Sequence, residues 1–524
     1  MIQNLFNPAG TTAPAFKKPV EISFNPQEPG VMPAETVTIE GTQMEPGLVS
    51  PRVRIAEPQD FPTPHADGKG NYVFAQDDPR FDDAETYACV TRALAMAENC
   101  LGRQLPWGFS QDLGRDQLIV HPHAGTNNAN AFYKGDAGSL NFFSFTDPAT
   151  HEMERTGDSS DIVSHETGHA LLDALRRDYL KSASVSSSGF HEAFGDMTAI
   201  TMALYSEKVV DQLWDQTQGD LTQPNLVAHL AERLGNASAH MDGSDGPGFL
   251  RNANNDYKYA DQHFLPFTDK NHPNSAPGQE CHAYSNLFTG AFWDVLNGVY
   301  KDIMASDKSL TFKQGIAQAR DVSAKLLYRG MEFAPVGDIN YKTAAEAMMK
   351  ADEVDTGGKY RGILEDVFRG RQILTGADLK AYDQHENALP DVSLDAKVKD
   401  GDSAMAFLKA NASKLDLPDD RPWNFLDKRT NDKGETFLLY DFTKKFDLAG
   451  TQFGTLDGAK METTGGLLLA FDKGGKLIED NFDDVTDNDI QDMQDGLVSA
   501  NKHGAVMLGT PAVPSQNDIT MADG

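Results

Sequence analysis

Apolar residues recur every three to four positions along several stretches of the chain, which is the period of an amphipathic helix. In residues 82–101 this repeat includes Tyr87 and Leu94, and Gly102 ends it. A mixed helical pattern covers residues 211–233, and a loop rich in Gly, Ser, Asp and Pro is expected at 235–248. The helical period predicts further helices in the second half of the chain, at residues 286–300, 311–333, 341–351, 360–374 and 404–415.

Short runs of β-branched and aromatic residues between turn residues predict strands. They lie near the two ends of the chain, at residues 20–24, 36–39, 118–121, 130–133, 141–145, 436–440 and 466–471. A front part rich in strands and a back part rich in helices predict an α+β fold.

The patterns divide the chain into four parts. Residues 1–66, rich in proline and short polar residues, are expected to form an extended arm on the body, although the same composition is typical of a disordered leader. A β-rich lobe with two further helices is expected at 67–200 and a helical lobe at 201–377. The sequence turns polar after residue 377, and a small α+β accessory domain is expected at 396–524.

Charge and cysteine content limit the classes of function. The net charge of −32 and the isoelectric point near 4.7 disfavour binding to nucleic acids or anionic membranes, whose phosphates would be repelled. Three cysteines are an odd number, so no disulfide framework is expected. Neither an export signal nor a membrane-spanning stretch is visible, so we expect a soluble chain, cytoplasmic or exported by a non-standard route.

The densest group of candidate chemical residues lies at 159–172 and 189–196. His165 and His169 are four residues apart, so on a helix both imidazoles share one face and can converge on one cation. A catalytic zinc ion usually takes three protein ligands, and Glu192, on a second predicted helix, is the best candidate for the third. Asp196, one turn later, can accept the N–H of a ligating histidine.

Glu166 stands beside the histidine pair and is a candidate general base, since it is close to the metal without being placed to ligate it. A short His-Glu-x-x-His match also arises by chance on amphipathic helices whose histidines are ordinary surface or core residues. The added spacing of Glu192 and Asp196 favours the metal site.

Five segments resemble the thermolysin-like zinc metallopeptidases, the gluzincins, and occur in the order found in that family. The resemblance covers roughly residues 70–375. The segments are 161–169 with the His-Glu-x-x-His motif, 192–196, 130–133, the Leu250-Arg251 pair, and His282-Ala283-Tyr284-Ser285. The resemblance implies a two-lobed peptidase with its zinc helices between the lobes. It also implies an endopeptidase in which zinc is held by His165, His169 and Glu192.

The resemblance assigns further roles by position. Asn130 and Ala131 would belong to an edge strand that holds an extended peptide, and Ile162 and Leu250 would line the pocket for a bulky apolar residue after the cut. Arg251 would bind a substrate carbonyl. His282 would stabilise the oxyanion, and Tyr179 is a weak candidate for assisting it. Plainer alternatives are a turn residue at Asn130, a solvated cation at Arg251 and a helix cap at His282.

The resemblance has limits. The family's calcium cluster keeps Asp161, but Ala203 stands where a partner acid is expected, which puts Ca²⁺ at that place in doubt. Two acidic runs, 480–484 and 487–489, could bind a divalent ion but are more typical of a solvated helix start. Residues after 395 have a faint likeness to the propeptide domains of these enzymes, which would imply inhibition or folding assistance, with passive docking as the plainer alternative.

The pattern therefore supports two hypotheses of different classes. The first is a zinc endopeptidase acting on peptide or protein substrates, with no nucleic-acid partner. The second is a catalytically idle or latent zinc protein that serves as an interaction or effector module, in which the metal only joins two helices. Glu166 favours the first, since a structural site has no need of a base. No charged signature for binding a peptide terminus is visible, so an exopeptidase is not indicated.

Overall fold

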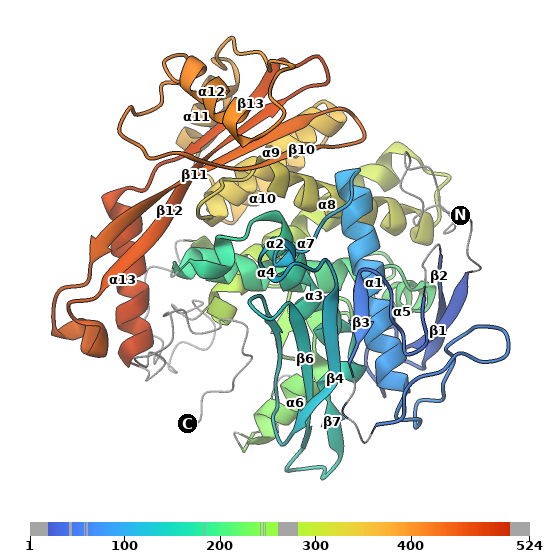
Figure 1. The fold of residues 1–524 in the computed structure, drawn as a ribbon. Helices are drawn as coiled ribbons and strands as arrows, with labels where there is room; N and C mark the ends of the chain where they lie inside the picture. The colour runs from blue at the N-terminus through green and yellow to red at the C-terminus, as the bar shows by residue number, and fades with distance from the viewer. Residues whose placement is uncertain are drawn as a thin grey trace.

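The computed structural model describes residues 19–502 except 41–43, 57, 59–60, 183, 242, 245, 247 and 260–280. It is a mixed α and β structure, as the sequence predicts (Figure 1). One sheet lies near the N-terminal part of the chain, a second near the C-terminal part, and helices fill the space between them. None of the helices within the described ranges is long and apolar enough to cross a membrane.

The N-terminal sheet has the order β3-β4-β6-β5, and β7 also pairs with β6. Strand β5 is an edge strand, as expected for the segment around Asn130. A separate hairpin of β1 and β2 lies at residues 20–39 and contributes Ile22, Phe24 and Ile39 to the main core. The bounds are β1 (Val20–Phe24), β2 (Glu35–Ile39), β3 (Val53–Ile55), β4 (Leu118–Thr126), β5 (Ala131–Lys134), β6 (Ser139–Thr146) and β7 (Met153–Arg155).

Helix α1 (Phe81–Leu101) matches the predicted helix at 82–101 and packs against α3. It ends at Gly102, whose φ of 63° lies in the left-handed region that glycine adopts without strain. A short helix, α2 (Ser110–Leu113), follows before β4. The first 18 residues of the expected N-terminal arm lie outside the described residues.

Two helices in close contact form the centre of the molecule, α3 (Ser160–Leu175) and α4 (Val185–Ala203). Serines cap both: the side chain of Ser159 accepts a hydrogen bond from the Ile162 N–H, and Ser184 does the same for α4. Glycine sets how close the helices come, since a Cβ on Gly168 would lie 2.8 Å from the Cα of Gly195. The preceding 3₁₀ turns are η2 (Thr156–Asp158) and η3 (Tyr179–Lys181).

A helical layer follows, and it contains the helices predicted at 286–300, 311–333, 341–351 and 360–374, whereas the helix predicted at 404–415 belongs to the C-terminal part. The expectation of a loop throughout 235–248 is wrong, because residues up to 241 are helical and Gly235 lets that helix approach the backbone of Phe249. The layer also extends past the expected boundary at 377, since Leu379 and Tyr382 belong to the main core. The elements are α5 (Glu207–Thr217), β8 (His229–Leu230), α6 (Glu232–Met241), β9 (Arg251–Asn252), α7 (Cys281–Ser306), α8 (Phe312–Phe333), α9 (Tyr341–Thr356), α10 (Arg361–Gly370) and α11 (Gly376–Glu386).

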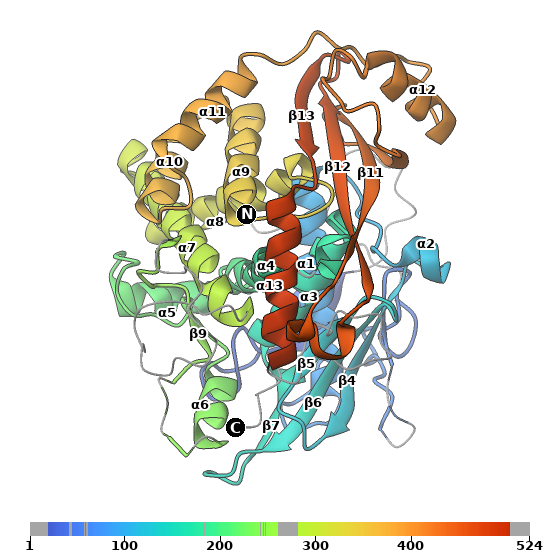
Figure 2. The same ribbon diagram turned by 90° about the vertical axis from the view of Figure 1, so that its left-hand side faces the viewer.

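The C-terminal part is a four-stranded antiparallel sheet in the order β10-β11-β12-β13, with helices α12 and α13. Helix α13 lies beside α4 (Figure 2). Of the two acidic runs, the one at 487–489 does begin a helix, but the expectation is wrong for Asp480 to Asp483, which lie in β13. The bounds are α12 (Gly401–Asn411), β10 (Asn424–Thr430), β11 (Thr436–Asp447), η5 (Thr451–Leu456), β12 (Lys460–Phe471), β13 (Leu477–Asp483) and α13 (Asp487–Lys502).

The C-terminal sheet packs directly on the helical layer. Phe437, Leu439, Leu468 and Ala470 form one apolar cluster with residues of the α8 and α9 region, which include Phe333, Val336 and Ala351. Burying this apolar surface joins the two parts of the chain.

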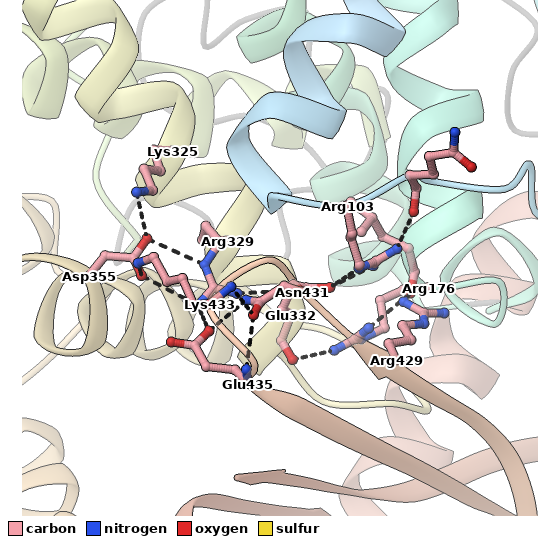
Figure 3. Close-up of polar contacts among 12 residues, drawn as sticks. Arg103, Arg176, Lys325, Arg329, Glu332, Asp355, Arg429, Asn431, Lys433 and Glu435 are labelled. Atoms are coloured by element: carbon pink, nitrogen blue, oxygen red, sulfur yellow. Dashed lines mark hydrogen bonds and ion pairs between the residues drawn. The ribbon is translucent and has the colours of Figure 1, made fainter. Parts of the chain in front are cut away.

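A buried ion network lies beside this apolar cluster (Figure 3). At its centre Arg329 is 1% exposed in its side chain and contacts three carboxylates: Glu332 at 2.9 Å, Asp355 at 3.3 Å and Glu435 at 2.5 Å. Because Glu435 belongs to the turn between β10 and β11, this cation joins the C-terminal sheet to α8 and α9. Arg103, after α1, binds the same Glu332 at 2.6 Å.

Arginines also connect this network to the ends of helices. Arg429 of β10 donates from Nη1 to the carbonyl of Leu175, the last residue of α3, at 3.2 Å. Arg176 donates to three carbonyls at the end of α8 and just after it, those of Glu332, Ala334 and Pro335. A guanidinium is well placed at a helix C-terminus, where unpaired carbonyls carry partial negative charge.

Replacing Arg329 with methionine should lower the free energy of unfolding by about 3–5 kcal/mol, because three buried carboxylates lose their shared cation. Urea denaturation measures the loss. The matched control is Lys325→Met, which removes an exposed partner of the same Asp355 and should cost no more than about 1 kcal/mol. Equal small losses in both variants would contradict the central role of Arg329.

Candidate metal centre

Helices α3 and α4 bring the predicted metal ligands together. Nε2 of His165 lies 3.3 Å from one carboxylate oxygen of Glu192, and Nε2 of His169 lies 3.6 Å from the other. All three side chains are at most 4% exposed. Two ligands of one tetrahedral zinc ion, each about 2.0–2.1 Å from it, lie roughly 3.3–3.4 Å apart. The spacing of these atoms therefore suits a shared cation.

Buried polar atoms without hydrogen bonds converge at the same place. Glu166 Oε1 is buried and makes no hydrogen bond within the described part of the chain. The same holds for His165 Nε2 and Glu192 Oε2, which face each other at 3.3 Å as an ion pair. Buried polar atoms normally have hydrogen-bond partners, so several unsatisfied ones in the same place indicate that the site binds a ligand. His165, Glu166 and His169 together offer donor atoms within 4.8 Å of one another, close enough to hold a metal ion.

Asp196 orients the first histidine. Its Oδ1 lies 3.0 Å from Nδ1 of His165, which leaves Nε2 facing Glu192. The same carboxylate receives the guanidinium of Arg251, with Nε 2.9 Å from both oxygens, and the hydroxyl of Thr289 at 3.2 Å. Three partners fix the carboxylate, so the imidazole that it holds has little freedom to turn.

Sequence reasoning missed His191, which performs the equivalent task for the second histidine. Nδ1 of His191 lies 2.6 Å from Nδ1 of His169, and both rings are buried. Burial lowers the pKa of both histidines, that of His191 to about 4, so both rings are neutral. One proton then lies in the hydrogen bond between the two Nδ1 atoms. If His169 donates that proton, its Nε2 keeps a lone pair toward Glu192, as a metal ligand requires. In the sequence, the only signal for this role of His191 is its position next to Glu192.

The charged states of the cluster follow from its surroundings. Although burial would raise the pKa of Glu192, His282, His169 and His165 hold it well below its usual value, so the carboxylate is ionised. Burial would lower the pKa of His165, but Asp196 and Glu192 outweigh burial and raise it to about 9. A divalent ion must displace the proton on His165, so the affinity of the cluster for the ion should fall as the pH drops below the pKa of His165.

Glu166 is anchored by the edge strand of the N-terminal sheet. Its Oε2 accepts a hydrogen bond from the backbone N–H of Tyr133 in β5 at 3.0 Å, which leaves Oε1 beside the histidines. Burial raises the pKa of Glu166 to about 8, although His165 opposes the shift. A nearby divalent cation would lower this pKa, because it stabilises the ionised form.

The start of α7 closes another side of the cluster. Nε2 of His282 lies 3.5 Å from the Oε2 atom of Glu192, so the residue expected near the oxyanion does reach the cluster. Cys281, which sequence reasoning treated only as an odd thiol, offers its sulfur within 4.8 Å of donor atoms on Glu192 and His282. Cys281 Sγ and His282 Nδ1 are 3.6 Å apart.

A small pocket borders the cluster on the side of Arg251. The two residues expected to line a specificity pocket, Ile162 and Leu250, both line it, together with His165 and Asp196. Its remaining lining is mainly apolar and comes from Ala199, Leu230, Ala231, Asp161 and Arg251. Among the described residues, Asp161 is in none of the groups that could hold a metal ion, and its pKa is raised by burial and by Glu28 and Glu232.

The structure does not bring Tyr179 to the metal cluster. Its hydroxyl is fully buried and donates to the carbonyl of Pro335 at 2.5 Å, so the side chain packs the core behind α3. Asn130 lies just before β5; its side-chain oxygen accepts a hydrogen bond from the N–H of Ala131, and its carbonyl accepts one from the hydroxyl of Thr156. Only the main chain of this strand is placed near Glu166, through Tyr133.

Changing His191 to phenylalanine should weaken binding of Co²⁺ to the cluster by about 10- to 100-fold, because the ring stays but the acceptor for His169 is lost. Competition with a chelator measures this affinity. The control is His191→Asn, whose amide oxygen can stand near the position of Nδ1 and should retain most of the affinity. Equal affinities in the phenylalanine variant and the wild type would show that His191 does not orient His169.

Bound metal should protect Cys281 from alkylation by iodoacetamide, because the ion would lie against the thiol. Cys89 and Cys100 serve as internal controls, since burial raises the pKa of each thiol to about 12 and should keep both slow with or without metal. Peptide mass spectrometry after timed labelling identifies the modified site. If Cys281 is labelled at the same rate with and without metal, the ion does not lie against its thiol.

No protein-family model matches the chain, and a search of curated proteins also finds no match. The function of the cluster is therefore inferred from the geometry of its own side chains.

Proposed function

We propose that the chain is a zinc endopeptidase of the thermolysin-like, two-lobed type. One observation carries the proposal: two imidazoles and one carboxylate from adjacent helices converge in a buried cluster, with an additional carboxylate, Glu166, beside them. Structural zinc sites usually have four protein ligands, whereas three ligands with a nearby unligated carboxylate are typical of a catalytic site.

The donor set favours zinc among the divalent ions. Two imidazole nitrogens and a carboxylate suit zinc, whereas calcium and magnesium prefer oxygen ligands alone. His165, His169 and Glu192 would hold the ion. When bound, it would supply Lewis acidity, which makes water more acidic and polarises a carbonyl.

Glu166 is the group that would move the proton. Its Oε1 makes no hydrogen bond to any described residue, and its Oε2 is fixed on the N–H of Tyr133, so the carboxylate is held with one oxygen available. A base works best when its pKa lies near the operating pH, and burial shifts Glu166 in that direction. In this role it takes a proton from the attacking water and delivers it to the leaving amine.

Other residues would position the substrate. Strand β5 is an edge strand whose outer side could pair with an extended peptide. The pocket of Ile162 and Leu250 has a volume of only about 10 Å³, so it would have to widen to take an apolar side chain. His282 stands where it can donate to the carbonyl oxygen as negative charge develops there, an interaction commonly worth about 3 kcal/mol. Arg251 acts here through Asp196, with which it forms a bidentate pair.

Replacing Glu166 with glutamine should reduce peptide hydrolysis by about 10²- to 10⁴-fold while zinc content and folding stay unchanged, because only the proton acceptor is lost. Cleavage of a quenched peptide and elemental analysis of the same sample measure both. Chelation should abolish wild-type cleavage, and added Zn²⁺ should restore it.

The control variant is Glu207→Gln, an exposed carboxylate on α5 that should leave activity unchanged. Unimpaired hydrolysis in Glu166→Gln would refute the assigned base. A wild-type chain that binds zinc stably and cleaves nothing would instead support the idle or latent zinc protein.

A further inference from the structure

A pocket of about 260 Å³ lies where the helical layer meets the C-terminal sheet. Figure 2 shows the three elements around it, α9, α11 and β13. Its lining is rich in ionisable side chains: Lys342, Glu346, Lys350, His385, Glu386, Glu479 and Asp480. It is remote in sequence from the zinc ligands and plays no part in the proposed hydrolysis.

Three side chains in this pocket have the spacing of metal ligands. Nε2 of His385 lies 3.2 Å from Oδ1 of Asp480 and 3.5 Å from Oε1 of Glu479. All three offer donor atoms within 4.8 Å of one another. These separations bracket the roughly 3.3–3.4 Å expected between two ligands of one tetrahedral zinc ion.

The charge in the pocket leaves room for a divalent cation. Four carboxylates line it, those of Glu346, Glu386, Glu479 and Asp480, against the two ammonium groups of Lys342 and Lys350. Lys350 already contacts both Glu386 and Glu479, so it cannot also neutralise Asp480. Lys342 contacts Asp378, which lies outside the pocket lining, at 2.7 Å, so its charge is also shared with a carboxylate that the lining does not include. The lining therefore keeps an excess of negative charge that a divalent ion could offset.

Polar atoms without partners support a ligand here. Oε1 of Glu386 and the hydroxyl of Tyr382 are buried and make no hydrogen bond to any described residue, and Tyr382 is only 9% exposed. A protonated His385 would explain the contacts with Glu479 and Asp480, but it would leave both of these atoms unsatisfied. A metal ion that carries a water could satisfy them.

We propose that His385, Glu479 and Asp480 form a second metal site, which binds Zn²⁺ and ties α11 of the helical layer to β13 of the C-terminal sheet. One imidazole with two carboxylates suits a divalent transition metal better than calcium or magnesium. The side chain of His385 is 47% exposed, so the ion has a path from solvent. Such a site would make attachment of the C-terminal sheet depend on metal.

Metal counting on the full-length chain tests the proposal. After dialysis against Zn²⁺, the wild type should hold two ions per chain and His385→Gln one. A fully active wild type that holds a single ion would overturn the second site and leave the peptidase intact. A wild type that holds two ions and cleaves nothing would support the second site and overturn the proposed peptidase. The matched control is His240→Gln, which breaks a histidine–carboxylate pair with Asp147 that belongs to no metal-binding group among the described residues, and it should still hold two ions.

Thermal unfolding gives a second readout that does not depend on activity. Zn²⁺ added to protein whose first site is already filled should raise the midpoint in the wild type and in Glu166→Gln, but not in His385→Gln. If His385→Gln does not fold, Asp480→Asn replaces it, since the amide keeps the shape and loses the charge. Affinity for the second ion should fall more than tenfold in either variant. An unchanged second affinity in both would overturn the proposal.

Discussion

The contact between α3 and α4 is the constraint on which the candidate site depends. Gly168 and Gly195 meet where the helices cross, and a Cβ on Gly195 would lie 2.6 Å from Nδ1 of His165. Without side chains at these two positions the helices come close enough for the histidines of one to face Glu192 of the other. Since all three groups are buried, the energy that gathers them comes from packing of the helices, and the site is arranged before any ion arrives.

Holding polar groups in this dry space requires partners for their far sides. Asp196 and His191 serve the two histidines, and the N–H of Tyr133 serves Glu166. Each comes from a position that is itself fixed: Asp196 by Arg251, and Tyr133 by the sheet. Hydrogen bonds thus hold the outer sides of the carboxylates and imidazoles that converge on one point. They limit how far these side chains can relax away from one another.

Local periodicity was enough to predict most helices and strands, and the spacing of His165, His169, Glu192 and Asp196 was enough to predict a cluster, because each depends on neighbours along one or two helices. What the sequence could not predict depends on distant segments. Tyr179 bonds to Pro335, and His385 meets Glu479 across a domain junction; neither pair has a local signature. The helix that crosses residues 235–241 was missed because its glycine and serine composition is typical of a loop.

The bond from Arg429 to the carbonyl of Leu175 has a consequence for synthesis. The two residues are 254 positions apart, and a ribosome that adds roughly 5–20 residues per second needs roughly 13–50 s to cover that distance. Until then the Leu175 carbonyl at the end of α3 has Arg176 but not Arg429 as a donor, and Arg329 lacks the Glu435 carboxylate. The nascent polypeptide therefore completes its scaffold last, long after the histidines have left the exit tunnel.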